Sequence, residues 1–163
     1  MNIIDKNIDG GQPFDWGKTS LDYAKFRDIY PLEFYEKMIC RNLCVNGQNV
    51  LDLGTGTGVL PRNMYHYGAK WTATDISENQ IEQAKLLSQD LDIAYHVVPA
   101  EDINFAADSF DVITACQCFF ILITRKLCRI FTACLSPVGV FLFYIWHGCR
   151  LKMKWQVQVK IWY

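Results

Sequence analysis

The chain has 163 residues, of which 51% are hydrophobic and 20% are charged, and its formal net charge is −1. This length and composition predict one folded domain with its own core, and they exclude a disordered or fibrous chain. A net charge near zero gives no electrostatic reason to expect a nucleic-acid partner. Seven cysteines, an odd number without a CxxC pair, favour reduced and mostly buried thiols over a disulfide framework or a metal site.

The first segment, residues 1–45, is predicted to hold an N-terminal lead followed by lid helices. Its first residues lack the basic-then-apolar pattern of a signal peptide, so we expect a cytoplasmic protein. From Ser20 to about Cys44, apolar residues recur at helical spacing. Pro31 divides this stretch and predicts a second helix that begins near it.

The second segment, residues 46–145, alternates predicted strands with predicted helices. Strands are expected at 49–53, 71–75, 93–98, 110–116 and 138–145, and helices at 58–67, 77–88 and 126–135. Gly68 predicts the end of the first of these helices, and Ser77 predicts the N-cap of the next one. This alternation predicts an α/β protein with a Rossmann-like, doubly wound and mostly parallel sheet.

An apolar stretch near the C-terminus raises the question of a membrane span. Residues 130–149 contain no Asp, Glu, Lys or Arg. Ser136-Pro137-Val138-Gly139 interrupts the stretch, and this composition indicates a turn between a helix and a strand. We therefore expect no stable membrane insertion.

The run from Val50 to Gly58 organises the predicted site. Three glycines at positions 54, 56 and 58 follow a strand and precede a helix, which is the pattern of the first βα turn of a Rossmann-like sheet. Each glycine permits a positive φ or close approach of a ligand to the backbone. A dinucleotide fingerprint has its third glycine three positions after the second, where Val59 stands, and no Gly-Lys-Ser/Thr follows. The spacing therefore argues against a nicotinamide-dependent oxidoreductase and against a P-loop.

Acidic residues near this loop favour a cationic ligand that carries a ribose. Asp52 lies at the mouth of the loop, where it suits a cofactor with a sulfonium and an ammonium better than a pyrophosphate. Asp75 ends the second strand, where a carboxylate can accept both ribose hydroxyls, or can serve only as a strand-end turn residue. Glu101 and Asp102 follow the third strand, where they can place polar groups near an adenine edge and also begin a helix.

Five motifs then occur in a characteristic order: Asp52–Gly58, Thr74–Ser77, Ala100–Asp102, Phe110–Ile113 and Leu135–Gly139. In these motifs the chain resembles the class I S-adenosylmethionine-dependent methyltransferases over about residues 14–144. Residues 14–31 are similar to the N-terminal lid of small-molecule members, in the style of the ubiquinone/menaquinone-biosynthesis-like branch.

This resemblance implies S-adenosylmethionine as the cofactor and methyl transfer to an unidentified small-molecule acceptor. The cofactor-binding residues it implies are Tyr23, Arg27, Asp52, Gly54, Thr55, Gly56, Gly58, Asp75, Ile76, Glu101, Asp102 and Cys116. Within this set the glycine loop holds the methionine part, Asp75 holds the ribose, and Glu101 and Asp102 flank the adenine. No catalytic acid or base is expected, because a sulfonium is a good leaving group and the protein mainly has to align the acceptor.

Three of these assignments have a plain structural alternative. Tyr23 and Arg27 would close over the cofactor, but ordinary helix packing and a solvated charge explain them equally well. Cys116, just past the fourth strand together with Gln117, would border the transferred methyl group, but a buried core thiol is an equally good interpretation.

The third segment, residues 146–163, departs from the family. A member would continue with a helix and two more strands, so we expect a C-terminally truncated core that lacks its usual last strands. Missing strands leave apolar surface open, which predicts self-association through the incomplete sheet edge. The alternative function is therefore a catalytically incompetent relative that keeps a residual cofactor pocket.

Two hypotheses account for this tail, and they can coexist. Codons permitted for residues 144–163, read two bases out of frame, can give a family-like sequence, so residues 145–163 are hypothesised to be a frameshift product. Residues 121–125 allow a similar but shorter re-reading. In contrast, apolar residues at every second position from Trp155 to Tyr163 predict a real strand that pairs beside the last core strand.

Overall fold

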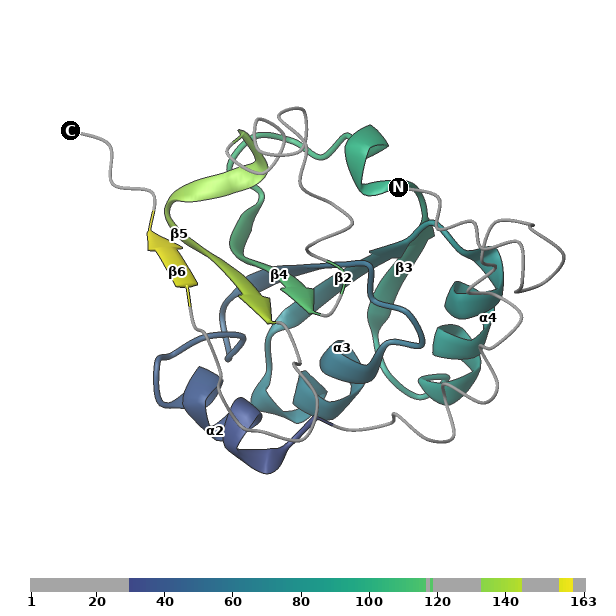
Figure 1. Cartoon of the computed structure of the whole chain (residues 1–163), viewed down its shortest axis with the longest axis horizontal. Coiled ribbons are helices and arrows are strands. Elements are labelled where there is room, and N and C mark those ends of the chain that lie inside the picture. The colour runs from purple at the N-terminus through teal and green to yellow at the C-terminus, as the bar shows by residue number, and fades with distance from the viewer. Residues whose placement is uncertain (1–29, 117, 119–132, 145–155, 160–163) are drawn as a thin grey trace, which may run out of the picture.

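The computed structural model describes residues 30–116, 118, 133–144 and 156–159. These residues form a six-stranded sheet in the order β3-β2-β1-β4-β5-β6 (Figure 1). The strands are β1 Asn49–Leu53, β2 Lys70–Asp75, β3 Ile93–Val97, β4 Phe110–Cys116, β5 Leu135–Tyr144 and β6 Gln156–Val159. Strands β1 to β5 are mutually parallel, and β6 is antiparallel to β5. The predicted Rossmann-like, mostly parallel sheet is thereby confirmed.

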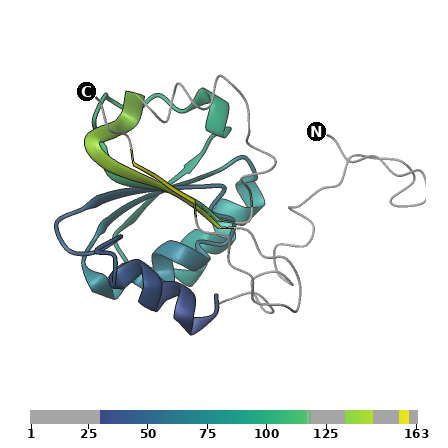
Figure 2. The same cartoon turned by 60° about the vertical axis from the view of Figure 1, so that its left-hand side comes forward.

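Helices cover the two faces of this sheet unequally. They are α2 Leu32–Ile39, α3 Val59–Met64 with its 3₁₀ continuation η3 Tyr65–Tyr67, α4 Glu78–Leu87, and the short 3₁₀ helix η4 Ala100–Asp102. Figures 1 and 2 show α2, α3 and α4 on one side of the sheet and η4 on the other. The chain order strand, helix, strand brings the loop after β1 to the carboxyl edge of the sheet, which is where α/β proteins bind ligands.

The helix boundaries follow from local chemistry. Pro31 immediately precedes α2, as its fixed φ and missing N–H favour. The Ser77 side chain accepts a hydrogen bond from the Gln80 N–H at 3.4 Å and caps α4. Gly68 ends η3 with a φ of +85°, a conformation that costs glycine little. All three predicted boundary residues are confirmed.

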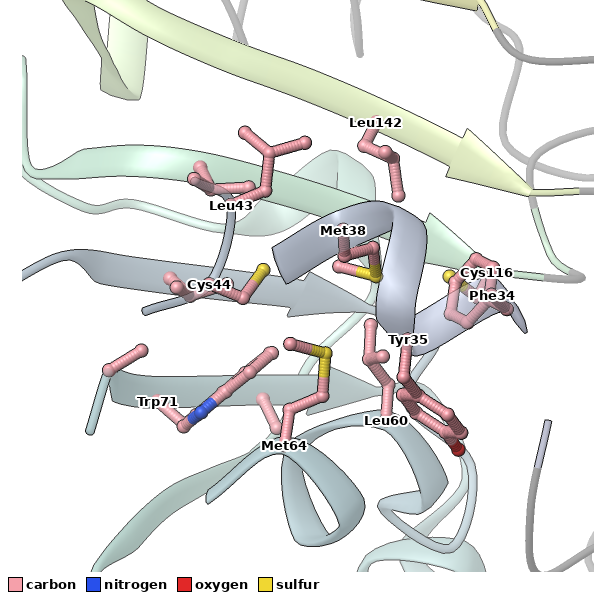
Figure 3. Packing of buried hydrophobic residues seen from close by; sticks show 14 of the residues in the cluster. Phe34, Tyr35, Met38, Leu43, Cys44, Leu60, Met64, Trp71, Cys116 and Leu142 are labelled. Atoms are coloured by element: carbon pink, nitrogen blue, oxygen red, sulfur yellow. The ribbon is translucent and has the colours of Figure 1, made fainter. Parts of the chain in front are cut away.

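Alternation along the central strands divides the core into two clusters. Val50 packs with α2 and α3 on one face, while Leu51 and Leu53 pack on the other. The first cluster is the larger, and Figure 3 shows α2 lying over it, with Phe34 and Met38 turned toward the sheet. A central strand buried on both faces is expected in a parallel sheet, and α2 adds a cover over β1, β4 and β5.

The start of β5 differs from the prediction. A helix was expected to reach Leu135 and a turn to occupy 136–139, but β5 begins at Leu135. Leu135 lies opposite Phe110 and Val140 opposite Val112, so four residues of β5 span the distance covered by one residue of β4. The turn residues therefore form an irregularity inside the strand rather than a boundary before it, because the strand ladder resumes on both sides of them.

The tail contributes β6. Val159 pairs with Val140 and Gln156 with Phe143, so the strand expected from the alternating pattern is confirmed for residues 156–159. The frameshift hypothesis stays a prediction, because only the encoding gene tests it.

Some predictions fall outside the described residues. They are the first lid helix with Tyr23 and Arg27, Gln117, and the helix expected over 126–132. In the part of the chain that the structure describes, no helix has the length and apolarity to cross a membrane. Part of the apolar stretch that raised this question, residues 135–144, is strand β5.

Candidate functional site

The loop between β1 and α3 has a backbone that only glycine adopts easily. Gly54 and Gly56 have a φ of +59°, and Gly58 has a φ of +74°. A residue with a side chain in this left-handed region costs about 1–2 kcal/mol. The Thr55 N–H donates to the Thr74 carbonyl at 2.9 Å, which ties the loop to the end of β2. The positive φ at positions 54, 56 and 58 therefore explains why glycine occupies all three.

Gly56 leaves room against the backbone at the middle of this loop. Among the described residues, the nearest atom to a methyl group placed on Gly56 is the Gln80 Oε1, at 3.8 Å. Such a separation is an ordinary van der Waals contact. The loop thus offers a cradle in which a ligand can approach the main chain closely.

Asp75 joins the glycine loop to α4. Its Oδ2 accepts a hydrogen bond from the Gly56 N–H at 2.9 Å, and its Oδ1 accepts one from the Ser77 N–H at 2.9 Å. Burial raises the pKa of Asp75, and the bonds from Ser77 and Gly56 oppose this rise. The Ile76 N–H acts in the same way, and because a carboxylate has about four acceptor positions, Asp75 can still accept from a hydroxyl group of a ligand. Asp75 is therefore a turn residue and a possible ligand acceptor at once.

Asp52 is a buried carboxylate beside the same loop. It is 2% exposed, and it lies opposite Thr114 in the β1–β4 register, so the Thr114 Oγ1 can donate to its Oδ1 at 2.6 Å. Burial raises the pKa of Asp52 to about 6, while the hydroxyls of Thr114 and Thr55 oppose the rise. The charge of Asp75 adds to this rise. Two carboxylates near each other, one of them fully buried, favour a ligand that brings a positive charge.

Cys116 lies near Asp52 but is not a nucleophile. Its side chain is 6% exposed, and burial together with the Asp52 charge raises the pKa of its thiol well above the usual range. A thiol reacts as a thiolate, so this environment keeps Cys116 inert. The burial of Cys116 is that of a core thiol.

The remaining predicted residues occupy the same edge of the sheet or lie outside the described residues. Ile76 follows Asp75 and is 71% exposed, which leaves an apolar side chain beside the carboxylate. Glu101, half-buried, and Asp102, exposed, are in η4, directly after β3. Tyr23 and Arg27 are not among the described residues, so their lid role stays a prediction.

Three residues at the site were not predicted. Thr114 binds Asp52, the Cys118 thiol donates to the Leu53 carbonyl at 3.0 Å beside Gly54, and Tyr95 reaches Gly58 from β3. A threonine among the apolar residues at the end of a buried strand is a detectable signal for a buried polar contact. Nothing in the sequence marks Tyr95 or Cys118, because their role depends on strand order.

A groove of about 380 Å³ lies near the amino-terminal ends of β1 and β4, whereas the glycine loop follows the carboxyl-terminal end of β1. It runs between the loop after α2, which includes Asn46 and Gln48, and the start of β4 at Asp111. Ligands of open α/β sheets bind at the carboxyl ends of the strands. This groove is therefore separate from the glycine-loop site.

Comparison with known proteins agrees with this geometry. A family model described as a methyltransferase domain matches residues 50–139. A ubiquinone biosynthesis O-methyltransferase from Aromatoleum aromaticum is 33% identical over 107 residues, which are 63% of this chain and 44% of that protein. This chain therefore matches less than half of the length of that curated relative.

Solved structures share the fold. The YcgJ protein from Bacillus subtilis is 26% identical with a TM-score of 0.62, over 68% of this chain and 49% of that one. An S-adenosylmethionine-dependent methyltransferase from Mesorhizobium loti is 23% identical with a TM-score of 0.60, over 76% and 63% of the two chains, and this similarity concerns the fold alone. Because the family match covers more than half of the chain and includes the glycine loop, this chain belongs to the class I methyltransferase domain family.

Proposed function

We propose that the glycine loop binds S-adenosylmethionine and that the protein transfers its methyl group to a small-molecule acceptor. The observation that carries this proposal is the link between Asp75 and Gly56: one carboxylate both shapes the loop and retains acceptor positions for a ribose. Membership of the methyltransferase domain family supports the choice of cofactor.

The residues present fit this cofactor at both of its ends. The open side of Gly56 admits the methionine part next to the main chain, where Asp52 offers a buried negative charge to the ammonium and sulfonium. Asp75 accepts the ribose hydroxyls. The exposed Ile76 side chain packs against one face of the adenine, and Glu101 and Asp102 supply polar groups at its edge.

The chain contributes binding, orientation and exclusion of water. S-adenosylmethionine supplies an activated methyl group with a good leaving group when it is bound. The glycine loop and Asp75 fix the adenosyl and methionine parts, so that the acceptor meets the methyl group in line. The buried, uncharged Cys116 thiol lies near Asp52, and the lid role that the family resemblance implies for Tyr23 and Arg27 stays a prediction.

Replacement of Asp75 by alanine tests this assignment. The variant loses a ribose hydrogen bond to a charged group, which is worth about 1.5–3 kcal/mol, so its affinity for S-adenosylmethionine falls about tenfold to a hundredfold. Isothermal titration calorimetry measures the change. Asp111→Ala is the matched control. Asp111 also accepts a hydrogen bond from a backbone N–H, that of Asn49, at 2.9 Å, but it lies at the amino-terminal end of β4, away from the glycine loop.

The two variants together decide the outcome. Unchanged binding by Asp111→Ala with weakened binding by Asp75→Ala supports the ribose assignment. Equal affinities for Asp75→Ala and the unaltered chain would remove it. Failure of the unaltered chain to bind S-adenosylmethionine would refute the proposed function itself.

A further inference from the structure

Each of the two outer glycines of the loop has a side chain from a distant part of the chain beside it. A methyl group placed on Gly58 would lie 2.5 Å from the Tyr95 hydroxyl oxygen, and one placed on Gly54 would lie 2.7 Å from the Cys118 Sγ. Both distances are far inside van der Waals contact, so neither position has room for a methyl group. Tyr95 and Cys118 therefore fill the space beside the backbone at both ends of the loop, while the central Gly56 has no such neighbour among the described residues.

Tyr95 is held firmly in this position. Its residue pairs with Ala73 in the β2–β3 ladder, which fixes the backbone from which the ring extends. The ring packs against the large core cluster, and its hydroxyl is hydrogen-bonded to the Ser88 hydroxyl at 3.2 Å. Ser88 is buried at the end of α4 and also donates to the Ala84 carbonyl. The tyrosine thus connects the C-terminal end of α4 to the start of α3 at Gly58.

Cys118 is anchored at the other end of the loop. Its thiol donates to the Leu53 carbonyl at 3.0 Å, so the sulfur lies over the last residue of β1 and the glycine after it. Burial raises the pKa of this thiol well above its usual range. The neutral sulfur acts here through its volume and its hydrogen bond rather than through reactivity.

We infer that Tyr95 and Cys118 are positioning residues that hold the glycine loop at its two ends and so preset Gly56 for the cofactor. This inference rests on the proposed function, because the loop is taken to be the S-adenosylmethionine site. A preset loop loses less conformational freedom on binding, which increases affinity without any direct contact to the ligand. Neither side chain has to touch the cofactor for this effect.

A double-mutant cycle on Gly58 and Tyr95 tests the contact. Gly58→Ala lowers the affinity for S-adenosylmethionine, because the new methyl group meets the Tyr95 hydroxyl. Tyr95→Phe removes that oxygen, and the nearest ring atoms then lie 3.3 Å from the new methyl group. The double variant with Gly58→Ala and Tyr95→Phe therefore regains part of the affinity. Calorimetric titration of the four proteins gives the coupling. An identical loss from Gly58→Ala with and without the tyrosine hydroxyl would overturn the inference.

A second pair of variants separates positioning from general stability. Tyr95→Leu is expected to weaken S-adenosylmethionine binding about tenfold, which corresponds to about 1.4 kcal/mol. Tyr65→Leu is the matched control, because Tyr65 also packs on the large core cluster and its hydroxyl accepts a bond from the Asp92 N–H at 3.1 Å, away from the loop. Both variants lower the thermal unfolding midpoint of the ligand-free chain, but only Tyr95→Leu changes the affinity. Equal effects of the two on affinity would show that Tyr95 acts only through stability.

Cys118 is tested in the same way. Cys118→Ser keeps the hydrogen bond in a slightly smaller side chain, so its affinity for S-adenosylmethionine stays close to that of the unaltered chain, whereas Cys118→Leu pushes on Gly54 and weakens binding. Cys134→Leu is the control, since the Cys134 thiol also donates to a backbone carbonyl, that of Phe105, in the same core cluster but just before the start of β5, away from the glycine loop. Unchanged affinity in Cys118→Leu would overturn this half of the inference. No binding by the unaltered chain would instead refute the proposed function and, with it, the inference built on it.

Discussion

Asp52 places an ionisable group where the folded chain disfavours its charge. Burial raises the pKa of Asp52 to about 6, against 3.8 for an unperturbed aspartate. Between these two values the folded chain binds more protons at this position than the unfolded chain does. The contribution of Asp52 to stability is therefore greatest below about pH 4 and is lost as the pH rises through about 6.

Replacement of Asp52 by asparagine tests this pH dependence. A shift of about two pKa units corresponds to about 3 kcal/mol, so the unaltered chain loses about that much stability relative to Asp52→Asn between pH 4 and pH 7. The raised pKa of Asp75 acts in the same direction but is common to both proteins. Urea unfolding at several pH values measures the difference. Parallel pH profiles for the two proteins would contradict the buried-carboxylate assignment.

The same carboxylate predicts how cofactor binding responds to pH. Because a cationic ligand favours the ionised form of Asp52, affinity for S-adenosylmethionine rises as the pH increases through about 6. Asp52→Asn carries no charge, so its affinity is lower and shows a smaller rise. Titration calorimetry at pH 5 and pH 7.5 gives both values. A pH-independent affinity in the unaltered chain would show that Asp52 does not face the cationic end.

At the level of elements, α2 is bound to the sheet by its buried side chains. Phe34 is fully buried in the large cluster (Figure 3). Leu32 on the same helix is 66% exposed. Phe34→Ala is expected to lower the free energy of unfolding by about 3–5 kcal/mol, because it leaves a cavity under the helix. Leu32→Ala, the matched control, changes it by less than about 0.5 kcal/mol. Similar losses in the two variants, measured by urea unfolding, would mean that α2 does not pack as described.

The elements that could be predicted from the sequence are those with strong local signals. β1 and α4 were predicted because apolar spacing, Ser77 and the glycines each act over a few residues. The start of β5 was missed because the turn residues Ser136–Gly139 lie inside a strand irregularity, and only pairing with β4 shows this. Local chemistry identifies a turn, but it does not say whether a ladder continues beyond it.

The residues of the candidate site also fall into two groups, those that sequence motifs locate and those that only the folded sheet brings to the site. Asp52, Asp75 and the glycines belong to motifs that the chain carries at fixed spacing, so the sequence locates them. Thr114 meets Asp52 across 62 residues of chain, and Tyr95 and Cys118 reach the loop through the order of strands in the sheet. Those contacts depend on tertiary register, which no short stretch of sequence encodes.

At the scale of the whole molecule, one edge of the sheet is only partly paired. β6 pairs with residues 140–143 of β5, and no other described strand lies on that side of residues 135–139. Val138 in this section is 85% exposed. An open apolar strand edge is a template for pairing with a second copy. We therefore expect the chain to self-associate as its concentration increases.

Sedimentation velocity over a range of concentrations tests this expectation. Val138→Lys places a charge on the edge and reduces the association. Leu86→Lys makes the same charge change at an exposed position on α4, away from the edge, and leaves the association unchanged. A stable monomer at every concentration of the unaltered chain would contradict the prediction.

The central claim concerns the ligand of the glycine loop, and parallel calorimetric titrations of the unaltered chain with S-adenosylmethionine and NAD test it most directly. The spacing of Gly54, Gly56 and Gly58, the buried Asp52 and the position of Asp75 predict saturable binding of S-adenosylmethionine and no binding of NAD. Saturable binding of NAD, with S-adenosylmethionine failing to bind or to compete, would contradict the account.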